Sequence, residues 1–348
     1  MCVRGIKPQG AKSPLLTIVI PFYNTRLDLV GRCLRQINML PENEIEVVII
    51  DDGSEPAIVA GLRELTQNCS TSVSVYSKKN GGQNSARQLG IEFANGEYLL
   101  FHDADDFIEV AATMDALEYL KSNTPDVLAF GYDEVDCDGR TLKEVVPWQP
   151  GFNVVSKAKI LMESDSLCRQ FYRTETIRSL SFGLTQGIRI GEDLSSAISY
   201  ALALSDFRSF GGILYHYVRY QGSATGSVTS DRLDDIRAAF DIVFSRFDVA
   251  SDVNYSEIEW MAILHVLMWG NRRIIEVVGP SKEKKIDVYA WMNDRFPKWK
   301  SNLYIDQALK DGGIRYRLLI MGRWKTFYLI QKVYKIALRV LEAVRSSR

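Results

Sequence analysis

The sequence has 348 residues, enough for one large or two modest domains with a full hydrophobic core. Hydrophobic residues make up 46% and charged residues 24%, which excludes a wholly disordered or collagen-like chain. The 42 Lys and Arg residues against 43 Asp and Glu residues give a net charge of -1, so we expect no nucleic-acid partner. The five cysteines form no CxxC pair, which predicts reduced thiols rather than a disulfide framework or a zinc cluster.

We predict neither a membrane-spanning segment nor a secretory signal in this sequence. The N-terminal extension, residues 1–14, is basic but lacks an apolar core, so we expect no secretory signal. The best candidate for a membrane span, residues 258–269, is shorter than the roughly 18–20 residues required and contains Glu259 and His265. We therefore expect a cytoplasmic protein in which this stretch is a buried helix.

Short apolar runs alternate with amphipathic stretches through the first part of the chain. We predict strands at 16–21, 46–50, 72–76, 98–101 and 127–130, and helices at 27–39, 56–67, 84–94 and 110–122. The strand runs are uninterrupted rather than alternating, as expected for strands that are covered on both faces. Strand followed by helix, repeated, indicates parallel strands with right-handed crossovers. The predicted fold class is therefore α/β, a doubly wound and mostly parallel sheet flanked by helices.

The pattern then changes. Asp138-Gly139 predicts a hairpin turn, and a mixed region follows to about residue 220. From there we predict helices at 231–247, 255–277, 281–295 and about 316–345. A Gly-, Ser- and Thr-rich stretch near residue 225 marks a soft boundary between residues 15–225 and a mainly helical region at 226–348.

The segments that follow the predicted strands are the candidates for chemistry, because open parallel sheets bind ligands at the carboxyl ends of their strands. These segments are Pro21-Phe22-Tyr23-Asn24, Asp51-Asp52-Gly53-Ser54, the Gly-rich residues 78–82 and Asp103-Ala104-Asp105-Asp106. Two carboxylate clusters on one rim repel each other unless a cation or hydrogen-bond donors hold them. We interpret this arrangement as a functional site.

Each segment also has a plain structural interpretation. The DADD run offers the hard oxygen ligands that Mg²⁺ or Mn²⁺ prefers, yet Asp105 or Asp106 alone would cap the following helix. The DDGS run is also typical of a turn with Ser54 as a helix cap. The Gly-rich entry to the helix near residue 84 favours anionic ligands but lacks a Walker motif, so an ordinary loop is the alternative.

Together these motifs resemble those of the family 2 glycosyltransferases with the GT-A fold. The resemblance rests on residues 17–24 (TIVIPFYN), 49–54 (IIDDGS), 81–106 and 191–193 (GED), and it covers roughly residues 15–220. It implies a nucleotide-diphosphate-sugar donor, usually UDP-linked, a divalent Mn²⁺ or Mg²⁺ ion and inversion at the anomeric carbon. It also implies a catalytic domain at 15–225, with its nucleotide-sugar half at about 15–132 and its acceptor half at 133–225.

The resemblance also implies roles for individual residues. Pro21 and Tyr23 would flank the base, and Asp52 would bind the uracil with Asp51 beside it. The remaining donor-side candidates are Gly82 and Arg87 near the nucleotide, Asp103 in the DxD run, and Asp105 and Asp106 nearest the metal. The register of the DADD run stays open, so Asp103 is a further candidate metal ligand. His216 is another, although a satisfied histidine in an aromatic-rich strand is the alternative for it.

The GED segment is the candidate for the catalytic base. Asp193 matches the position of the family's general base, with Glu192 next to it. An inverting transfer needs a base on the acceptor side of the sugar, so the donor-side carboxylates cannot also fill this role. The alternative is that the pair only caps the helix that follows.

The C-terminal segment is strongly basic. Residues 314–348 hold nine Lys and Arg residues and one acidic residue, a net charge of +8. An apolar stripe runs through Ile330, Tyr334, Ala337, Leu341 and Val344. A basic amphipathic helix of this kind suits an anionic membrane surface, so residues 316–348 are candidates for peripheral attachment to the inner face of the plasma membrane. The alternative is a helix packed on the catalytic domain.

The sequence thus predicts a metal-dependent glycosyltransferase that moves a sugar to a hydroxyl of a glycan acceptor in bacterial surface polysaccharide synthesis. A lipid-linked acceptor would fit the basic segment. The enzyme alternative, a metal-dependent nucleotidyltransferase, usually has a basic Gly-rich loop after its first strand, where this chain has Pro-Phe-Tyr-Asn. The third candidate is a non-catalytic scaffold with the same fold, which the intact DADD and GED motifs disfavour.

Overall fold

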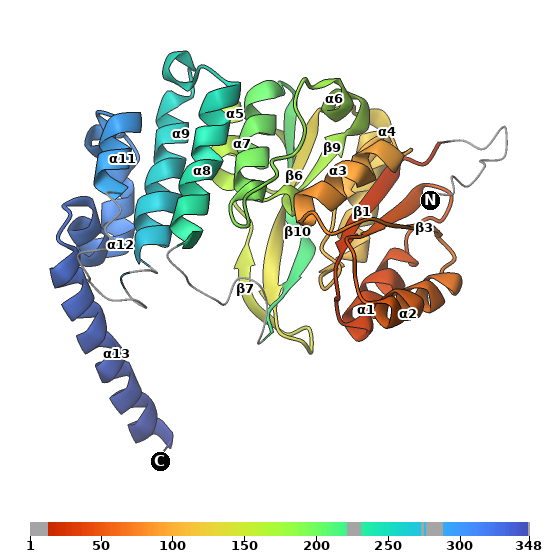
Figure 1. Ribbon diagram of the computed structural model, residues 1–348, viewed down its shortest axis with the longest axis horizontal. Coiled ribbons are helices and arrows are strands. Elements are labelled where there is room, and N and C mark those ends of the chain that lie inside the picture. The colour runs from red at the N-terminus through yellow and green to blue at the C-terminus, as the bar shows by residue number, and fades with distance from the viewer. Residues whose placement is uncertain (1–12, 221–230, 273–274, 276–287, 347–348) are drawn as a thin grey trace. The chain divides into compact units, whose positions relative to one another are not determined.

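The structure, a computed structural model, describes residues 13–220, 231–272, 275 and 288–346 (Figure 1). The chain divides into two compact units, Met1–Ser223 and Ala224–Arg348, which are described separately below. Among the described residues, no helix combines the length and the apolar character needed to cross a membrane.

The described part of the first unit is built around a ten-stranded sheet with the order β3-β2-β1-β4-β9-β6-β10-β5. Strand β7 adds to β6, and β8 adds to β10. The strands are β1 (Leu16–Phe22), β2 (Ile45–Asp51), β3 (Ser72–Ser77), β4 (Tyr98–Phe101), β5 (Phe107–Ile108), β6 (Val127–Val135), β7 (Thr141–Val145), β8 (Phe152–Val154), β9 (Gln170–Arg173) and β10 (Phe207–Val218).

The predicted fold class is confirmed in the first half of this unit. Strands β1, β2, β3 and β4 pair in parallel, and the apolar runs of β1 and β4 are buried along their whole length. The connecting helices are α1 (Leu27–Ile37), α2 (Pro56–Gln67), α3 (Gln83–Phe93) and α4 (Val110–Ser122). Their starts follow from local chemistry: Pro56 opens α2, and the side chain of Glu109 accepts a bond from Ala112 N–H at the start of α4.

The second half of the unit departs from this alternation. Strand β9 lies between β4 and β6 and is antiparallel to both, although the sequence predicted no strand there. Its four residues carry no periodic signal long enough to detect. Helices α5 (Lys157–Glu163), α6 (Thr174–Ser179) and α7 (Glu192–Ala203) complete the unit. The predicted hairpin at Asp138-Gly139 is confirmed by the antiparallel pairing of β6 and β7.

The described part of the second unit is helical. It contains α8 (Asp231–Arg246), α9 (Tyr255–Ala262), the π-helix Ile263–Asn271, α11 (Val288–Arg295), α12 (Ile305–Ile320) and α13 (Trp324–Ser346). The predicted helix at 255–277 is α9 continued by a π-helix to Asn271. Residues 273, 274, 276 and 277 of that prediction, and residues 281–287 of the predicted 281–295 helix, lie outside the described residues.

The prediction of one helix over 316–345 is wrong. Helix α12 ends at Ile320 and α13 begins at Trp324. Between them Gly322 has φ +69°, a left-handed conformation that ends a helix and that glycine adopts without strain. The first turns of α13 then pack against α12: Phe327 is fully buried in a cluster with Leu318 and Leu319, with Trp324 and Tyr328 against it.

Candidate functional site

The carboxyl ends of β1, β2 and β4 meet at one edge of the sheet, as predicted. Phe22 at the end of β1 is the register partner of Asp51 at the end of β2, and Val19 pairs with Phe101, which ends β4. A single residue, His102, separates Phe101 from the DADD run. The acidic segments after β2 and β4 therefore lie on the same edge, on either side of the segment that follows β1.

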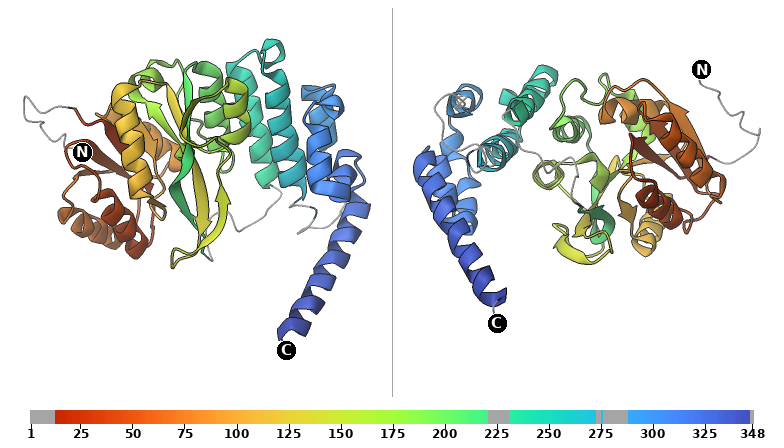
Figure 2. Two further views of the ribbon diagram at one scale, coloured as in Figure 1. Left: turned by 180° about the vertical axis from the view of Figure 1, so that it is seen from behind. Right: turned by 60° about the horizontal axis from the view of Figure 1, so that its bottom comes forward.

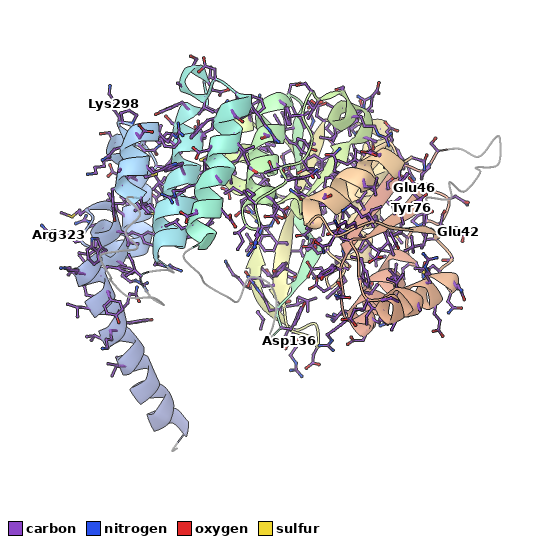
Figure 3. All side chains as sticks on the ribbon, viewed as in Figure 1. Glu42, Glu46, Tyr76, Asp136, Lys298 and Arg323 are labelled. Atoms are coloured by element: carbon purple, nitrogen blue, oxygen red, sulfur yellow. The ribbon has the colours of Figure 1, made fainter. Side chains whose placement is uncertain are left out.

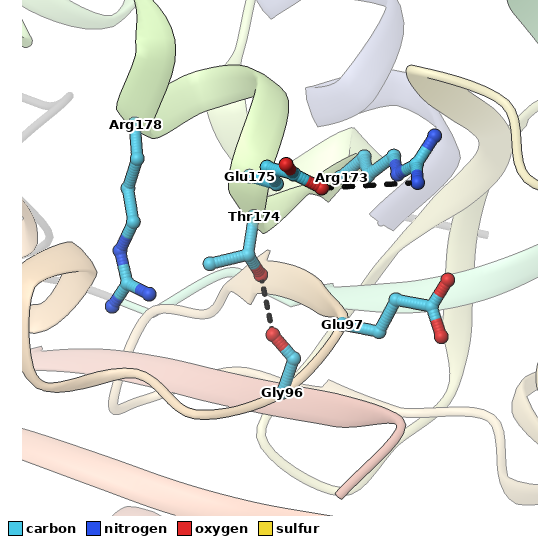
Figure 4. A pocket seen from close by; sticks show the side chains of 6 residues that line it. All are labelled: Gly96, Glu97, Arg173, Thr174, Glu175 and Arg178. Atoms are coloured by element: carbon cyan, nitrogen blue, oxygen red, sulfur yellow. Dashed lines mark hydrogen bonds and ion pairs between the residues drawn. The ribbon is translucent and has the colours of Figure 1, made fainter. Parts of the chain in front are cut away.

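A pocket of about 370 Å³ lies elsewhere on the unit (Figure 4). Its lining residues, Gly96, Glu97, Arg173, Thr174, Glu175 and Arg178, precede β4 or surround the end of β9. Thr174 donates to Gly96 O over 2.6 Å, and Arg173 pairs with Glu175 over 3.9 Å. This pocket is therefore at the opposite end of β4 from the DADD run.

Asp52 organises the Gly-rich loop before α3. Its carboxylate accepts bonds from Lys78 Nζ over 2.6 Å, from Gly81 N–H over 2.9 Å and from Gly82 N–H over 2.8 Å. Asp52 is itself buried. The anion held at this helix entry is therefore a side chain of the protein, and the loop predicted to favour an anionic ligand is bound to Asp52 instead.

The segment after β1 leaves an aromatic ring exposed. Tyr23 is 55% exposed, whereas Pro21 beside it is buried. Asn24 anchors the segment: its N–H donates to Ser54 Oγ, and its side-chain carbonyl accepts from Glu55 N–H. Asp51 in turn accepts a bond from Ser54 N–H over 2.8 Å, so it fixes the turn after β2.

Arg87 joins the donor-side and acceptor-side carboxylates. From the second turn of α3 its guanidinium donates to Asp103 Oδ1 over 2.7 Å and to Asp193 Oδ1 over 2.5 Å. It also donates to Asn84 Oδ1 over 2.9 Å, and its side chain is completely buried. Gln83 donates to Asp103 as well, over 2.7 Å. The structure thus brings together Arg87, Asp103 and Asp193, which were predicted from separate motifs. Arg87 connects the two carboxylates from a buried position and is not exposed at the surface of the site.

Asp105 and Asp106 are held by β10 and the residues after it. Tyr220 O–H donates to Asp105 Oδ2 over 2.8 Å, Tyr215 O–H donates to Asp106 Oδ2 over 2.5 Å, and Val218 N–H donates to Asp106 Oδ1 over 2.8 Å. Within the described part of the chain, neither carboxylate forms an ion pair with Lys or Arg. Burial, reinforced by the neighbouring aspartates, raises the pKa of Asp105 and of Asp106 above the usual range.

Glu192 and Asp193 occupy the first turn of α7. Burial raises the pKa of Glu192 to about 7, and the charge of Asp193 beside it adds to the effect. Burial also raises the pKa of Asp193, although the Arg87 guanidinium opposes that rise. Of the two, Asp193 therefore has the fixed cationic partner, and Glu192 is the carboxyl group that titrates near neutrality.

The histidines have contacts of their own. His216 pairs through Nδ1 with Asp133 Oδ1 over 2.6 Å, and its ring stacks on Phe107 with centroids 4.5 Å apart. His102 is completely buried, with Nδ1 3.6 Å from Cys33 Sγ, and burial lowers its pKa to about 4. With a carboxylate partner and a stacked ring, His216 has the contacts of a structural strand residue. This was the alternative to a role as metal ligand.

The sequence did not single out three of these partners. Tyr215 and Tyr220 bond Asp106 and Asp105, and Gln83 bonds Asp103. The tyrosines belong to the aromatic-rich run at 215–220, and that composition was the available signal. Their partners were not predictable, because β10 is distant in sequence from the DADD run. It comes close to that run only through its pairing with β5 and β6.

The DADD run fits a divalent cation in its chemistry. Carboxylate oxygens have two lone pairs each, so Asp105 and Asp106 keep acceptor capacity after the bonds described. Their charges also lack the cationic partner that Asp103 has in Arg87. In the part of the sequence that the structure describes, no group of three or more His, Cys, Asp or Glu side chains is arranged to hold a metal ion. A bound diphosphate and water would therefore have to supply the remaining ligands.

Comparisons with known proteins agree with the fold and the motifs. Residues 17–175 match the model of glycosyl transferase family 2. The chain is 26% identical over 189 residues to the uncharacterized glycosyltransferase EpsJ of Bacillus subtilis, which covers 52% of this chain and 54% of EpsJ. It is 24% identical over 220 residues to the minor teichoic acid biosynthesis protein GgaB of Bacillus subtilis, which covers 60% of this chain and 23% of GgaB.

A solved structure extends the likeness to both units. Residues 1–349 of Staphylococcus aureus TarS, crystallised in complex with UDP-GlcNAc, match with a TM-score of 0.71 and 16% identity over 92% of each chain. At this identity the likeness shows the fold. The family model and the curated relatives show that residues 17–175 are similar to glycosyl transferase family 2.

Proposed function

We propose that this protein transfers a sugar from a nucleotide-diphosphate sugar, with uridine as the base, to a hydroxyl group of a glycan acceptor. The observation that carries the proposal is the bridge made by Arg87, which connects the DADD carboxylates to the GED segment. A donor-side and an acceptor-side carboxylate held at one guanidinium give a site for two substrates. The names of GgaB and of the UDP-GlcNAc complex of TarS support a surface-polymer acceptor and a UDP-sugar donor.

On the donor side, Tyr23 would stack on the base, because its ring is exposed beside the ends of β1 and β2. The predicted role of Asp52 in binding uracil would require part of its carboxylate to leave Lys78, Gly81 or Gly82. We therefore propose that Asp52 mainly shapes the loop against which the nucleotide lies, and that Asp51 fixes the turn beside it.

Asp105 and Asp106 would hold a Mn²⁺ or Mg²⁺ ion, with Asp103 kept for Arg87. When bound, such an ion neutralises the charge of the departing diphosphate. The argument for this assignment is the charge balance of the run. Asp103 has a cationic partner in Arg87, whereas burial and then the charge of Asp103 raise the pKa of both Asp105 and Asp106.

On the acceptor side, Asp193 is the proposed general base. The acceptor oxygen attacks the anomeric carbon, the bond to the diphosphate oxygen breaks, and the hydroxyl proton passes to Asp193, with inversion. Arg87 holds the orientation of this carboxylate and stabilises its ionised form. Glu192, with a pKa of about 7, is partly protonated at neutral pH, so it would serve better as a hydrogen-bond partner of the acceptor.

A panel of nucleotide-sugars, assayed for nucleotide release with glycan acceptors, tests the proposal. We expect release from a UDP-sugar, with turnover lowered by about 10²–10⁴ in Asp193→Asn and less in Glu192→Gln. Glu175→Gln, an exposed glutamate of the remote pocket, is the control and should keep full turnover. If Glu192→Gln loses turnover and Asp193→Asn keeps it, the two roles are reversed. No release from any nucleotide-sugar would contradict the proposal.

A further inference from the structure

Helix α13 has one face that is packed within its own unit. Phe327 and Gln331 are buried, and Trp324 and Tyr328 pack beside the cluster of Leu318, Leu319 and Phe327. The packed residues of α13 lie in its first two turns, next to the end of α12. Figures 1 and 2 show the rest of the helix continuing away from α11 and α12.

The other side of α13 is apolar and exposed. Leu329 is 61% exposed, Val333 67% and Ile336 54%. The exposed apolar face of α13 consists of these three residues with Ile330, Tyr334 and Ala337. At about 100° per residue, the six positions fall within an arc of roughly 160°, which makes a continuous surface rather than scattered side chains.

Basic residues border this face. Lys325 and Lys332 are exposed, and they are seven residues apart, a spacing that returns to nearly the same edge of a helix. Arg315 of α12 lies over the ring of Tyr334 at 5.6 Å. Arg323, labelled in Figure 3 where α12 gives way to α13, is exposed as well. Residues 314–348 as a whole carry +8, whereas the whole chain carries -1.

We propose that the exposed apolar face of α13 binds the surface of an anionic lipid bilayer. The apolar side chains would enter the boundary between headgroups and acyl chains while the lysines and arginines at its borders meet the lipid phosphates. The half-buried Trp324 and Tyr328 at the start of the helix are residue types suited to that boundary.

Charge favours a bilayer over a second copy of the chain. A second copy would bring the same basic border against this one, so burial of the apolar face would be opposed by repulsion between like charges. An anionic surface offers the opposite charge over an extended area, and each basic residue then adds to binding. The bilayer is thus the occupant that satisfies both the apolar face and its borders.

Co-sedimentation of the intact chain with lipid vesicles tests this proposal. We expect binding to vesicles of phosphatidylcholine and phosphatidylglycerol in a two-to-one ratio, and little binding to phosphatidylcholine alone. Val333→Asp/Ile336→Asp should abolish binding, whereas Val253→Asp, at a position 96% exposed in the same unit, should not. Lys325→Gln/Lys332→Gln should weaken binding about fivefold for each lysine, and the exposed pair Lys298→Gln/Lys300→Gln should have little effect.

Three outcomes would overturn the proposal. The first is failure of the intact chain to bind anionic vesicles. The second is equal binding to neutral vesicles, or binding that survives the two aspartates. The third is a concentration-dependent dimer in sedimentation velocity that Val333→Asp/Ile336→Asp dissociates while vesicle binding is absent, which would assign the face to a second copy. Thermal unfolding of each variant confirms that it is folded before it is compared.

Discussion

Arg87 is the residue on which the two halves of the site depend. Its buried guanidinium compensates the charges of Asp103 and Asp193, so Arg87→Ala leaves these two half-buried carboxylates without their cationic partner. We expect the free energy of unfolding to fall by about 3–5 kcal/mol, measured by urea denaturation. The control is Arg26→Ala, which removes an exposed pair with Asp28 and should cost less than about 1 kcal/mol. Equal losses in the two variants would contradict this role for Arg87.

Glu192 should make stability depend on pH in a defined direction. Its pKa rises from 4.5 in the unfolded chain to about 7 in the folded protein, so folding favours the protonated form. Its contribution is complete below pH 4.5 and is lost as pH rises towards 7. We therefore expect Glu192→Gln to gain about 2–3 kcal/mol relative to the native protein over this interval.

The measurement is urea denaturation of both proteins at a series of pH values. Glu175→Gln is the control, because Glu175 is exposed on the same unit and its substitution should leave the pH profile of the native protein unchanged. A constant difference between Glu192→Gln and the native protein from pH 4.5 to 8 would contradict the raised pKa.

At the scale of elements, the Gly-rich entry to α3 should depend on backbone conformation. Gly82 has φ +90° and ψ 164°, a region that residues with a Cβ atom avoid, and its N–H holds Asp52. We expect Gly82→Ala to lower the free energy of unfolding by about 1–3 kcal/mol. Gly31→Ala, inside α1 beside the end of the flexible Arg35 side chain, should be neutral or stabilising. A neutral Gly82→Ala would show that the loop relaxes freely.

The elements that were predictable are those with long local patterns. Strands β1 to β4 and helices α1 to α4 appear at or within two residues of their predicted bounds, because buried apolar runs and amphipathic periods are local properties. Strand β9 was missed because four residues carry no period, and its place between β4 and β6 is set by tertiary pairing. The break at Gly322 interrupts an otherwise continuous helical pattern, so the pattern alone favoured one helix.

The place of the candidate site was predictable from the sequence, but the contacts among its side chains were not. The carboxyl edge of the sheet followed from the topology, which gathers Asp51, Asp52 and the DADD run without any knowledge of side-chain contacts. The pairing of Arg87 with both Asp103 and Asp193 was not predictable, because it depends on the fold bringing the start of α3 to the start of α7.

At the scale of the whole molecule, the proposed sugar-transfer site lies in the first unit and the proposed lipid-binding helix lies in the second. The two are testable in one full-length protein, because the residues involved do not overlap. Asp105→Asn/Asp106→Asn is predicted to leave vesicle binding intact, and Val333→Asp/Ile336→Asp is predicted to leave nucleotide binding intact.

The most direct test of the central claim is isothermal titration of the intact protein with UDP, in Mn²⁺ and in excess chelator. We predict binding in Mn²⁺ that weakens at least about tenfold in chelator and in Asp105→Asn/Asp106→Asn, because the diphosphate loses its counter-charge. Glu97→Gln/Glu175→Gln, in the pocket of Figure 4, should bind UDP like the native protein. UDP affinity that is unchanged by chelator and by the aspartate substitutions, or lost in the pocket variant, would contradict the account.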